Sequence, residues 1–180
     1  MSNAPHHDLY PPRWISEDQT PKNLFNEILP GLFMGGTADD GTIDFPTELQ
    51  GLNDENPFDA VVTLYSWAQP MGWGVEELRY GFADAEVEHF DVNKLLATAR
   101  WAHSRWVDGD RVLIRCQAGL NRSGLVTALT LMLIGYHAVE AIALIRANRA
   151  EVALFNNAFV DWLVSVAPQL LGSLSSESAA

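Results

Sequence analysis

The sequence has little of three features on which many proteins depend. It has one cysteine in 180 residues, which excludes an internal disulfide framework and fits a reducing compartment. Only 11 lysines and arginines stand against 23 acidic residues, and the net charge of −12 disfavours nucleic acids and anionic membranes as partners. The apolar run at 125–134 is far shorter than the roughly 20 residues of a membrane-spanning helix. Residues 1–8 also lack the basic and apolar segments of a secretory signal. We therefore expect a soluble, cytoplasmic protein.

The composition favours one domain with two irregular ends. A hydrophobic content of 48% is ample for a core, and 180 residues suit a single domain. Residues 1–23 are rich in proline and are expected to form an irregular arm. Residues 172–180 are mostly small or polar and are expected to form a disordered tail. The folded domain is therefore placed at 24–171.

Hydrophobic periodicity predicts alternating strands and helices within this domain. Short strands are expected on both sides of a turn at Pro30-Gly31, with further strands at 59–65, 78–82 and 111–116. Helices are expected at 91–107, 122–135, 138–149 and 155–163, and a single helical turn near 46–50. Asp91 is the expected N-cap of the helix at 91–107. This order predicts a three-layer α/β domain, in which helices flank both faces of a central mixed, mostly parallel sheet of four or five strands.

One strand–loop–helix stretch carries the clearest chemical signal. The apolar residues at 112–114 predict a buried strand, and the run at 125–134 predicts a buried helix. The loop between them holds the only cysteine, Cys116, at its start and Arg122-Ser123 at its end. Free N–H groups at a helix N-terminus bind anions and stabilise a thiolate. Arg122 adds a planar fork suited to phosphate, and Ser123 is placed to donate its hydroxyl hydrogen to the sulfur.

The motif Cys-x5-Arg-Ser, with Gly119 inside it, resembles the signature of the cysteine-dependent protein tyrosine phosphatases, in particular their dual-specificity branch. The resemblance implies that Cys116 is the nucleophile and that Ser123 helps the sulfur to depart. The implied phosphate-binding residues are Gln117, Ala118, Gly119, Leu120, Asn121 and Arg122. No cofactor is implied, and the five histidines show no zinc-type spacing, so no metal site is predicted. The alternative, a structural cysteine beside an unrelated arginine, leaves the flanking strand and helix without a role.

Weaker matches to the same family cover about residues 26–165. The stretch at 26–36 looks like the start of the family's sheet and is assigned no chemistry. Near the other end, a pattern common in the family is matched by Arg146, Arg149, Asn157 and Phe159. Arg149 either supports the phosphate loop or lies on the surface at a helix end, where a cation complements the helix dipole.

Hydrolysis of a phosphate ester also needs an acid that protonates the leaving group. The resembled family carries an aspartate for this purpose on the loop after the preceding strand. Asp84 occupies that place in this sequence and is therefore the predicted general acid. The alternatives are Glu86 in the same role, or an ordinary solvated aspartate at position 84.

Arg115 departs from the family pattern, which has a histidine immediately before the cysteine. That histidine orders the phosphate loop and helps to stabilise the thiolate. Arg115 cannot accept a hydrogen bond, so we expect it either to keep a positive charge near the sulfur or to turn outward.

Two tryptophans, Trp67 and Trp73, lie in a turn-rich loop at 66–74. We expect one or both rings to pack over the edge of the sheet. The alternative is an aromatic wall beside the pocket.

The substrate class is indicated by what the phosphate loop lacks. Phosphoinositide-preferring relatives tend to carry lysines in this loop, whereas its residues between Cys116 and Arg122 are uncharged here. Relatives that act on RNA 5′-phosphates would need a basic approach, which the net charge disfavours. A protein phosphotyrosine, or phosphoserine or phosphothreonine, is therefore the expected substrate. The alternatives are a phosphatase of a non-protein phosphoester and a phosphate-binding pseudophosphatase. The sequence makes no prediction of oligomeric state.

Overall fold

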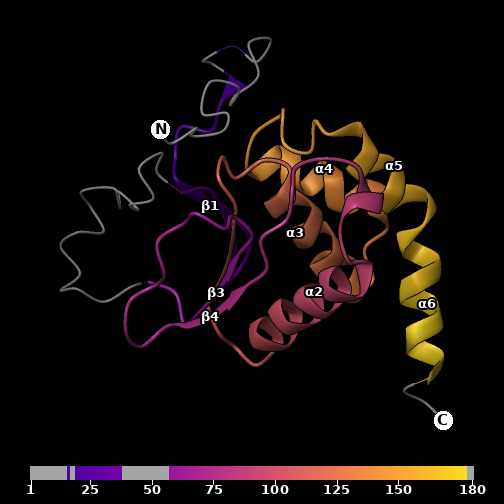
Figure 1. Ribbon diagram of the computed structural model, residues 1–180, viewed down its shortest axis with the longest axis horizontal. Coiled ribbons are helices and arrows are strands. Elements are labelled where there is room, and N and C mark those ends of the chain that lie inside the picture. The colour runs from indigo at the N-terminus through magenta and orange to yellow at the C-terminus, as the bar shows by residue number, and fades with distance from the viewer. Residues whose placement is uncertain (1–15, 17–18, 38–56, 178–180) are drawn as a thin grey trace, which may run out of the picture.

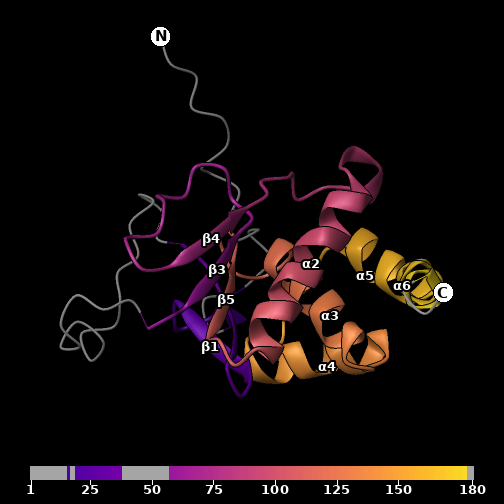
Figure 2. The ribbon, with the colours of Figure 1, turned by 90° about the horizontal axis from the view of Figure 1, so that it is seen from below.

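A five-stranded sheet packs one of its faces against the α-helices (Figures 1 and 2). The computed structural model describes residue 16, residues 19–37 and residues 57–177, and for residues 173–177 it describes the backbone alone. The predicted helical turn near 46–50 lies outside the described residues, and so does most of the predicted arm at 1–23.

The sheet has the strand order β1-β2-β5-β3-β4. Its members are β1 (Phe25–Leu29), β2 (Leu32–Gly35), β3 (Ala60–Thr63), β4 (Glu76–Arg79) and β5 (Val112–Arg115). β1 and β2 form an antiparallel hairpin, and all other neighbours are parallel. The carboxyl ends of four strands therefore meet at one edge, where parallel sheets place their binding sites. The residues that follow directly at this edge are Gly36, Leu64, Tyr80 and Cys116.

The α-helices supply most of the core. They are α2 (Val92–Val107), α3 (Arg122–Leu133), α4 (Ala138–Asn148), α5 (Asn157–Ser165) and α6 (Ala167–Glu177), with a short 3₁₀ helix, η3 (Val87–His89), before them. α3 is apolar on nearly all sides, so it is buried from 122 to 131, and α2 and α4 both pack against it (Figure 2). Asp91 caps α2 as predicted, because its carboxylate accepts hydrogen bonds from the N–H groups of Asn93 and Lys94.

The two faces of the sheet are covered differently. Successive side chains of a strand point to opposite faces, so Val112 and Ile114 of β5 join the helical core, whereas Leu113 and Arg115 lie on the other side. That second face carries a small apolar cluster of Phe33, Phe58, Val61 and Leu113. Within the described ranges no α-helix covers it. The predicted fold class, a mixed and mostly parallel sheet flanked by helices, is confirmed. The expectation that helices cover both faces is not met by the described residues, whose α-helices all pack against one face.

Most predicted elements lie within two residues of the observed ones, but one strand is displaced and α6 was not predicted. β4 begins at Glu76 and ends at Arg79, so the predicted strand at 78–82 was placed too late. The reason is that Phe82 leaves the sheet and packs against Phe90, with ring centroids 4.6 Å apart. α6 runs to Glu177 and thus extends into the predicted tail at 172–180, because Leu170 and Leu171 dock on the core. None of the described helices is both long and apolar enough to cross a membrane.

Candidate active site

The predicted phosphate loop connects the end of β5 to the start of α3. The N–H of Cys116 donates a hydrogen bond to the carbonyl of Gly35 (3.2 Å), and the N–H of Thr37 donates to the carbonyl of Gln117 (2.9 Å). The start of the loop therefore continues the pairing between β5 and β2. This places the loop at the sheet edge where the parallel strands end.

Glycines allow the loop to lie this close to β2. Gly119 has a positive φ of 69°, and a Cβ there would lie 2.4 Å from the carbonyl carbon of Gly35. A Cβ on Gly36 would lie 2.8 Å from the carbonyl oxygen of Gln117. Sequence analysis assigned no chemistry to the 26–36 stretch and did not predict that the phosphate loop packs against its two glycines. The glycine pair at the end of a strand was the available signal.

Cys116 and Ser123 are brought together by the first turn of α3. Cys116 is buried, with 2% of its surface exposed, and its Sγ lies 3.3 Å from the Oγ of Ser123. Both atoms lie near the N-terminus of α3, where the helix dipole favours an anion. The predicted nucleophile therefore has a hydroxyl within hydrogen-bonding distance of its sulfur.

Arg122 is buried beside the same helix terminus. Its Nη1 donates to the carbonyls of Phe82 (3.2 Å) and Leu64 (3.4 Å), and its guanidinium lies 5.5 Å from the centre of the Tyr65 ring. Its Nε is buried and has no hydrogen-bond partner in the part of the chain that the structure describes. A buried N–H without an acceptor is costly, and a bound oxyanion would supply that acceptor.

Asp84 lies on the loop after β4 and is bonded to the phosphate loop. Its two carboxylate oxygens accept hydrogen bonds from the side-chain amides of Asn121 (3.0 Å) and Asn156 (2.9 Å). Asn156 also caps α5 and donates from its backbone N–H to the Asn121 side chain (3.1 Å). Glu86, the alternative acid, is exposed. The structure thus brings Asp84 to the loop that carries Cys116.

The other predicted phosphate-binding residues differ in their surroundings. Leu120 is in the core, and its carbonyl accepts a hydrogen bond from the N–H of Leu154 (3.2 Å). Gln117 and Ala118 are partly buried. Leu120 therefore anchors the loop in the core, by its buried side chain and by its carbonyl.

Arg149 lies under the phosphate loop rather than on the surface. It is 7% exposed, and its Nε donates to the carbonyl of Gly119 (3.0 Å). Its Nη1 donates to the carbonyl of Asn23 (2.7 Å) and to the side chain of Asn26 (2.6 Å). Burial lowers the pKa of Arg149 to about 10, and the charge of the Cys116 thiolate opposes that shift. Of the two predicted locations, the structure therefore favours the one that supports the loop.

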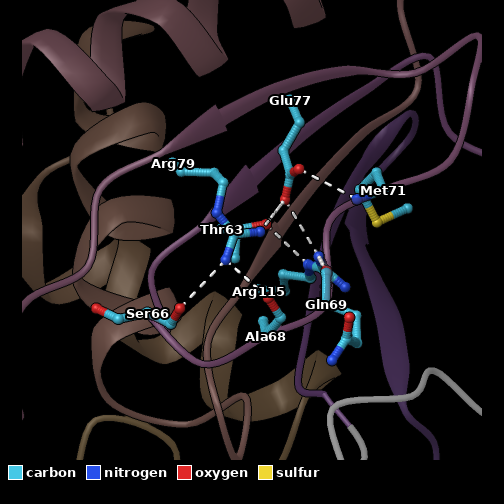
Figure 3. Close-up of polar contacts among 8 residues, drawn as sticks. All are labelled: Thr63, Ser66, Ala68, Gln69, Met71, Glu77, Arg79 and Arg115. Carbon is cyan, nitrogen blue, oxygen red and sulfur yellow. Dashed lines mark hydrogen bonds and ion pairs between the residues drawn. The ribbon is translucent and has the colours of Figure 1, made fainter.

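Arg115 points to the opposite face of the sheet from the helical core that holds Cys116, and it is fully buried (Figure 3). Its Nε donates to Thr63 Oγ1 (2.8 Å), and its Nη2 donates to the carbonyl of Gln69 (2.7 Å) and to Glu77 Oε1 (3.2 Å). Of the two alternatives for Arg115, an outward turn is wrong, because the side chain is buried and pairs with Glu77. Burial lowers the pKa of Arg115, and Glu77 opposes that shift.

Trp67 and Trp73 do not pack over the edge of the sheet. Their exposed fractions are 73% and 104%, so the prediction that one or both rings are packed was wrong. The physical reason is that polar contacts to its backbone, rather than its rings, hold this loop in place (Figure 3).

Potential metal ligands are scattered. Across residues 19–37 and 57–177, no three His, Cys, Asp or Glu side chains form a group that could hold a metal ion.

Solved structures resemble the chain over most of its length. Tk-PTP in its active form is 28% identical, with a TM-score of 0.61, and the match covers 78% of this chain and 93% of that one. A mouse putative dual specificity phosphatase complexed with zinc tungstate is 25% identical, with a TM-score of 0.63 and coverage of 87% and 95%. Human DUSP28 is 23% identical, with a TM-score of 0.64 and coverage of 80% and 93%. The chain has the fold of a dual-specificity phosphatase.

This likeness confirms the resemblance to the cysteine-dependent protein tyrosine phosphatase superfamily that the motif indicated. No family model and no curated protein sequence matches the chain. The roles of single residues within this phosphatase fold therefore depend on the geometry of the site.

Sequence analysis missed two polar residues that the structure places at the site. Asn156 contacts Asp84, whereas the family pattern had pointed to Asn157, one position later. The signal available was that asparagine is a common N-cap, and Asn156 caps α5. Glu77 had no signal, because nothing local distinguishes it from Glu76.

Proposed function

We propose that the protein hydrolyses phosphomonoesters through a phosphocysteine intermediate. The observation that carries this proposal is the grouping at the start of α3. There, the Cys116 sulfur lies 3.3 Å from the Ser123 hydroxyl, next to Arg122 with its unpartnered buried Nε. A nucleophile, a hydrogen-bond donor to that nucleophile and a cation with a free donor are the parts that phosphoryl transfer requires.

Two displacements account for the chemistry. In the first, the Cys116 thiolate attacks phosphorus, the bond from phosphorus to the leaving oxygen breaks, and Asp84 gives its proton to that oxygen. In the second, water attacks phosphorus, Asp84 takes a proton from the water, and the sulfur–phosphorus bond breaks. Ser123 donates a hydrogen bond to the departing sulfur, which leaves as the thiolate. Arg122 and the backbone N–H groups from Gln117 to Arg122 stabilise the charge on the phosphoryl oxygens.

The proposed substrate is a phosphorylated protein or peptide, with phosphotyrosine, phosphoserine or phosphothreonine. Support comes from a loop without lysine and from the net charge of −12, which disfavours polyanionic ligands. A cytoplasmic location, predicted from the single thiol, belongs to the same proposal.

The test is a substrate panel that separates binding from turnover. It contains peptides with each phosphorylated residue, a phosphoinositide and a 5′-phosphorylated RNA, and it compares wild type with Cys116→Ser by phosphate release and by binding. We expect wild type to hydrolyse the peptides, and Cys116→Ser to bind them without turnover. Residual activity of more than a few per cent in Cys116→Ser would mean that another nucleophile operates. Binding without turnover by wild type would favour the pseudophosphatase.

A further inference from the structure

Three charged side chains, Glu77, Arg79 and Arg115, form a network on the face of the sheet opposite the helical core (Figure 3). Glu77 Oε1 accepts hydrogen bonds from Thr63 Oγ1 (2.6 Å), Arg79 Nη1 (2.9 Å) and Arg115 Nη2 (3.2 Å). The Arg115 side chain is fully buried, that of Glu77 is 12% exposed and that of Arg79 is 34% exposed. The network spans three strands, since Glu77 and Arg79 lie on β4, Thr63 on β3 and Arg115 on β5.

The same three charges hold the backbone of the loop between β3 and β4. We call residues 64–71 the anchored loop. Arg79 Nη2 donates to the carbonyls of Ala68 (2.7 Å) and Ser66 (3.4 Å), and Arg115 Nη2 donates to that of Gln69 (2.7 Å). Glu77 Oε2 accepts from the N–H of Met71 (3.1 Å). Each of these contacts involves an ionised side chain, and hydrogen bonds of that kind are stronger than those between neutral groups.

The start of the anchored loop is in contact with Arg122. The Leu64 carbonyl accepts a hydrogen bond from Arg122 Nη1, and the Tyr65 ring lies beneath the guanidinium at 5.5 Å. The N–H of Leu64 donates in turn to the carbonyl of Arg115 (2.9 Å), the residue before Cys116. A shift of the anchored loop would therefore move two of the contacts that orient Arg122.

We propose that Glu77 is a positioning residue for oxyanion binding, which acts by fixing Arg115 and the anchored loop so that Arg122 is held ready for the phosphoryl group. The proposal rests on the proposed function in one respect, the assignment of Arg122 to phosphate. In this proposal Arg115, the residue before the cysteine, links Glu77 to the anchored loop.

An ion pair that only stabilises the fold makes a different prediction. Its loss would lower the free energy of unfolding but leave the affinity of the folded protein for an oxyanion unchanged. A positioning role requires that affinity to fall, because the groups that bind the oxyanion must be held close to their productive geometry.

The chain supplies a matched control on the same strand. Glu76 precedes Glu77 and pairs with Arg105 at 2.7 Å, but its side chain is 59% exposed. Glu76→Gln removes the same charge and one ion pair without touching the network. Because Glu77→Gln leaves Arg115 buried without its carboxylate and can unfold the protein, Arg79→Lys serves as a second variant. Lysine keeps a charge near Glu77 but lacks the fork that reaches Ser66 and Ala68.

The experiment measures tungstate binding by calorimetry, a readout that needs no turnover, together with kcat/KM for 4-nitrophenyl phosphate. All variants are full-length and are assayed well below their unfolding temperatures. We expect Glu77→Gln and Arg79→Lys to weaken tungstate binding roughly tenfold and to lower kcat/KM in parallel, with Glu76→Gln within about twofold of wild type.

The outcomes separate this proposal from the proposed function. Wild-type affinity in both Glu77→Gln and Arg79→Lys would overturn the positioning role, and so would an equal loss in Glu76→Gln. If Glu77→Gln does not fold, Arg79→Lys alone decides. If wild type binds tungstate but hydrolyses nothing, the proposed function fails and the tungstate affinities still decide the role of Glu77. If wild type binds no tungstate, both proposals fail.

Discussion

Replacement of Arg149 by methionine tests how the phosphate loop is supported. The change removes a buried cation that donates to Gly119, to the carbonyl of Asn23 and to the side chain of Asn26, at 3.0, 2.7 and 2.6 Å. A hydrogen bond from a charged donor contributes about 1.5–3 kcal/mol, but removal of the cation also recovers several kcal/mol of burial cost. We therefore expect Arg149→Met to lower the free energy of unfolding by about 3 kcal/mol.

The effect on activity should exceed what lost stability explains. Without the hydrogen bond from Arg149 to the Gly119 carbonyl, the phosphate loop loses its geometry. A misplacement of the catalytic groups by about 1 Å lowers the catalytic rate roughly 100-fold. Urea denaturation measures the first effect, and kcat/KM for 4-nitrophenyl phosphate measures the second under conditions where the variant is folded.

Arg146→Met is the matched control on the same helix. Arg146 donates to the carbonyls of Ala153 (3.0 Å) and Leu154 (3.1 Å), so it reaches the loop only indirectly, through the hydrogen bond from the Leu154 N–H to the Leu120 carbonyl. Its loss should lower stability by about 1 kcal/mol and leave activity near that of wild type. A folded Arg149→Met with wild-type activity, or an equal loss of activity in Arg146→Met, would refute the reasoning.

Much of the fold could be predicted because its signals are local. The apolar residues of β5 and the apolar run of α3 identify themselves by pattern alone, since both elements are buried on all sides. The motif from Cys116 to Ser123 spans a single loop, so its spacing in the sequence largely determines its geometry. The contact between Cys116 and Ser123 follows from that spacing.

The network of Glu77, Arg79 and Arg115 could not be predicted, because its members are distant in the chain. Glu77 and Arg115 are 38 positions apart and lie on β4 and β5, which flank β3 rather than each other. Which of two adjacent glutamates is buried depends on the register that pairs Val61 with Glu77. A slip of one residue would exchange the two glutamates between the faces. Sequence pattern does not encode that register for a strand with so few apolar residues.

The remaining predictions concern the acid, the thiol and the network. Asp84→Asn should lower kcat chiefly for substrates with poor leaving groups, and an equal loss across a leaving-group series would remove Asp84 from the acid role. Because Cys116 is the only cysteine, low peroxide should give over-oxidation, a sulfenamide or a mixed disulfide with an added thiol, and a disulfide-linked dimer as main product in mass spectrometry would contradict this. Burial alone would raise the pKa of Glu77, but Thr63, the Met71 N–H, Arg79 and Arg115 outweigh it and bring that pKa below its ordinary 4.5. A carboxyl whose pKa is lower in the folded state contributes stability above pH 4.5 and loses it as the pH falls through the folded value. The difference in unfolding free energy between wild type and Glu77→Gln should therefore be constant near neutral pH and shrink below pH 4.5. Urea titrations at a series of pH values measure it. A difference that stays constant to about pH 3 would show that the Glu77 charge does not stabilise the network.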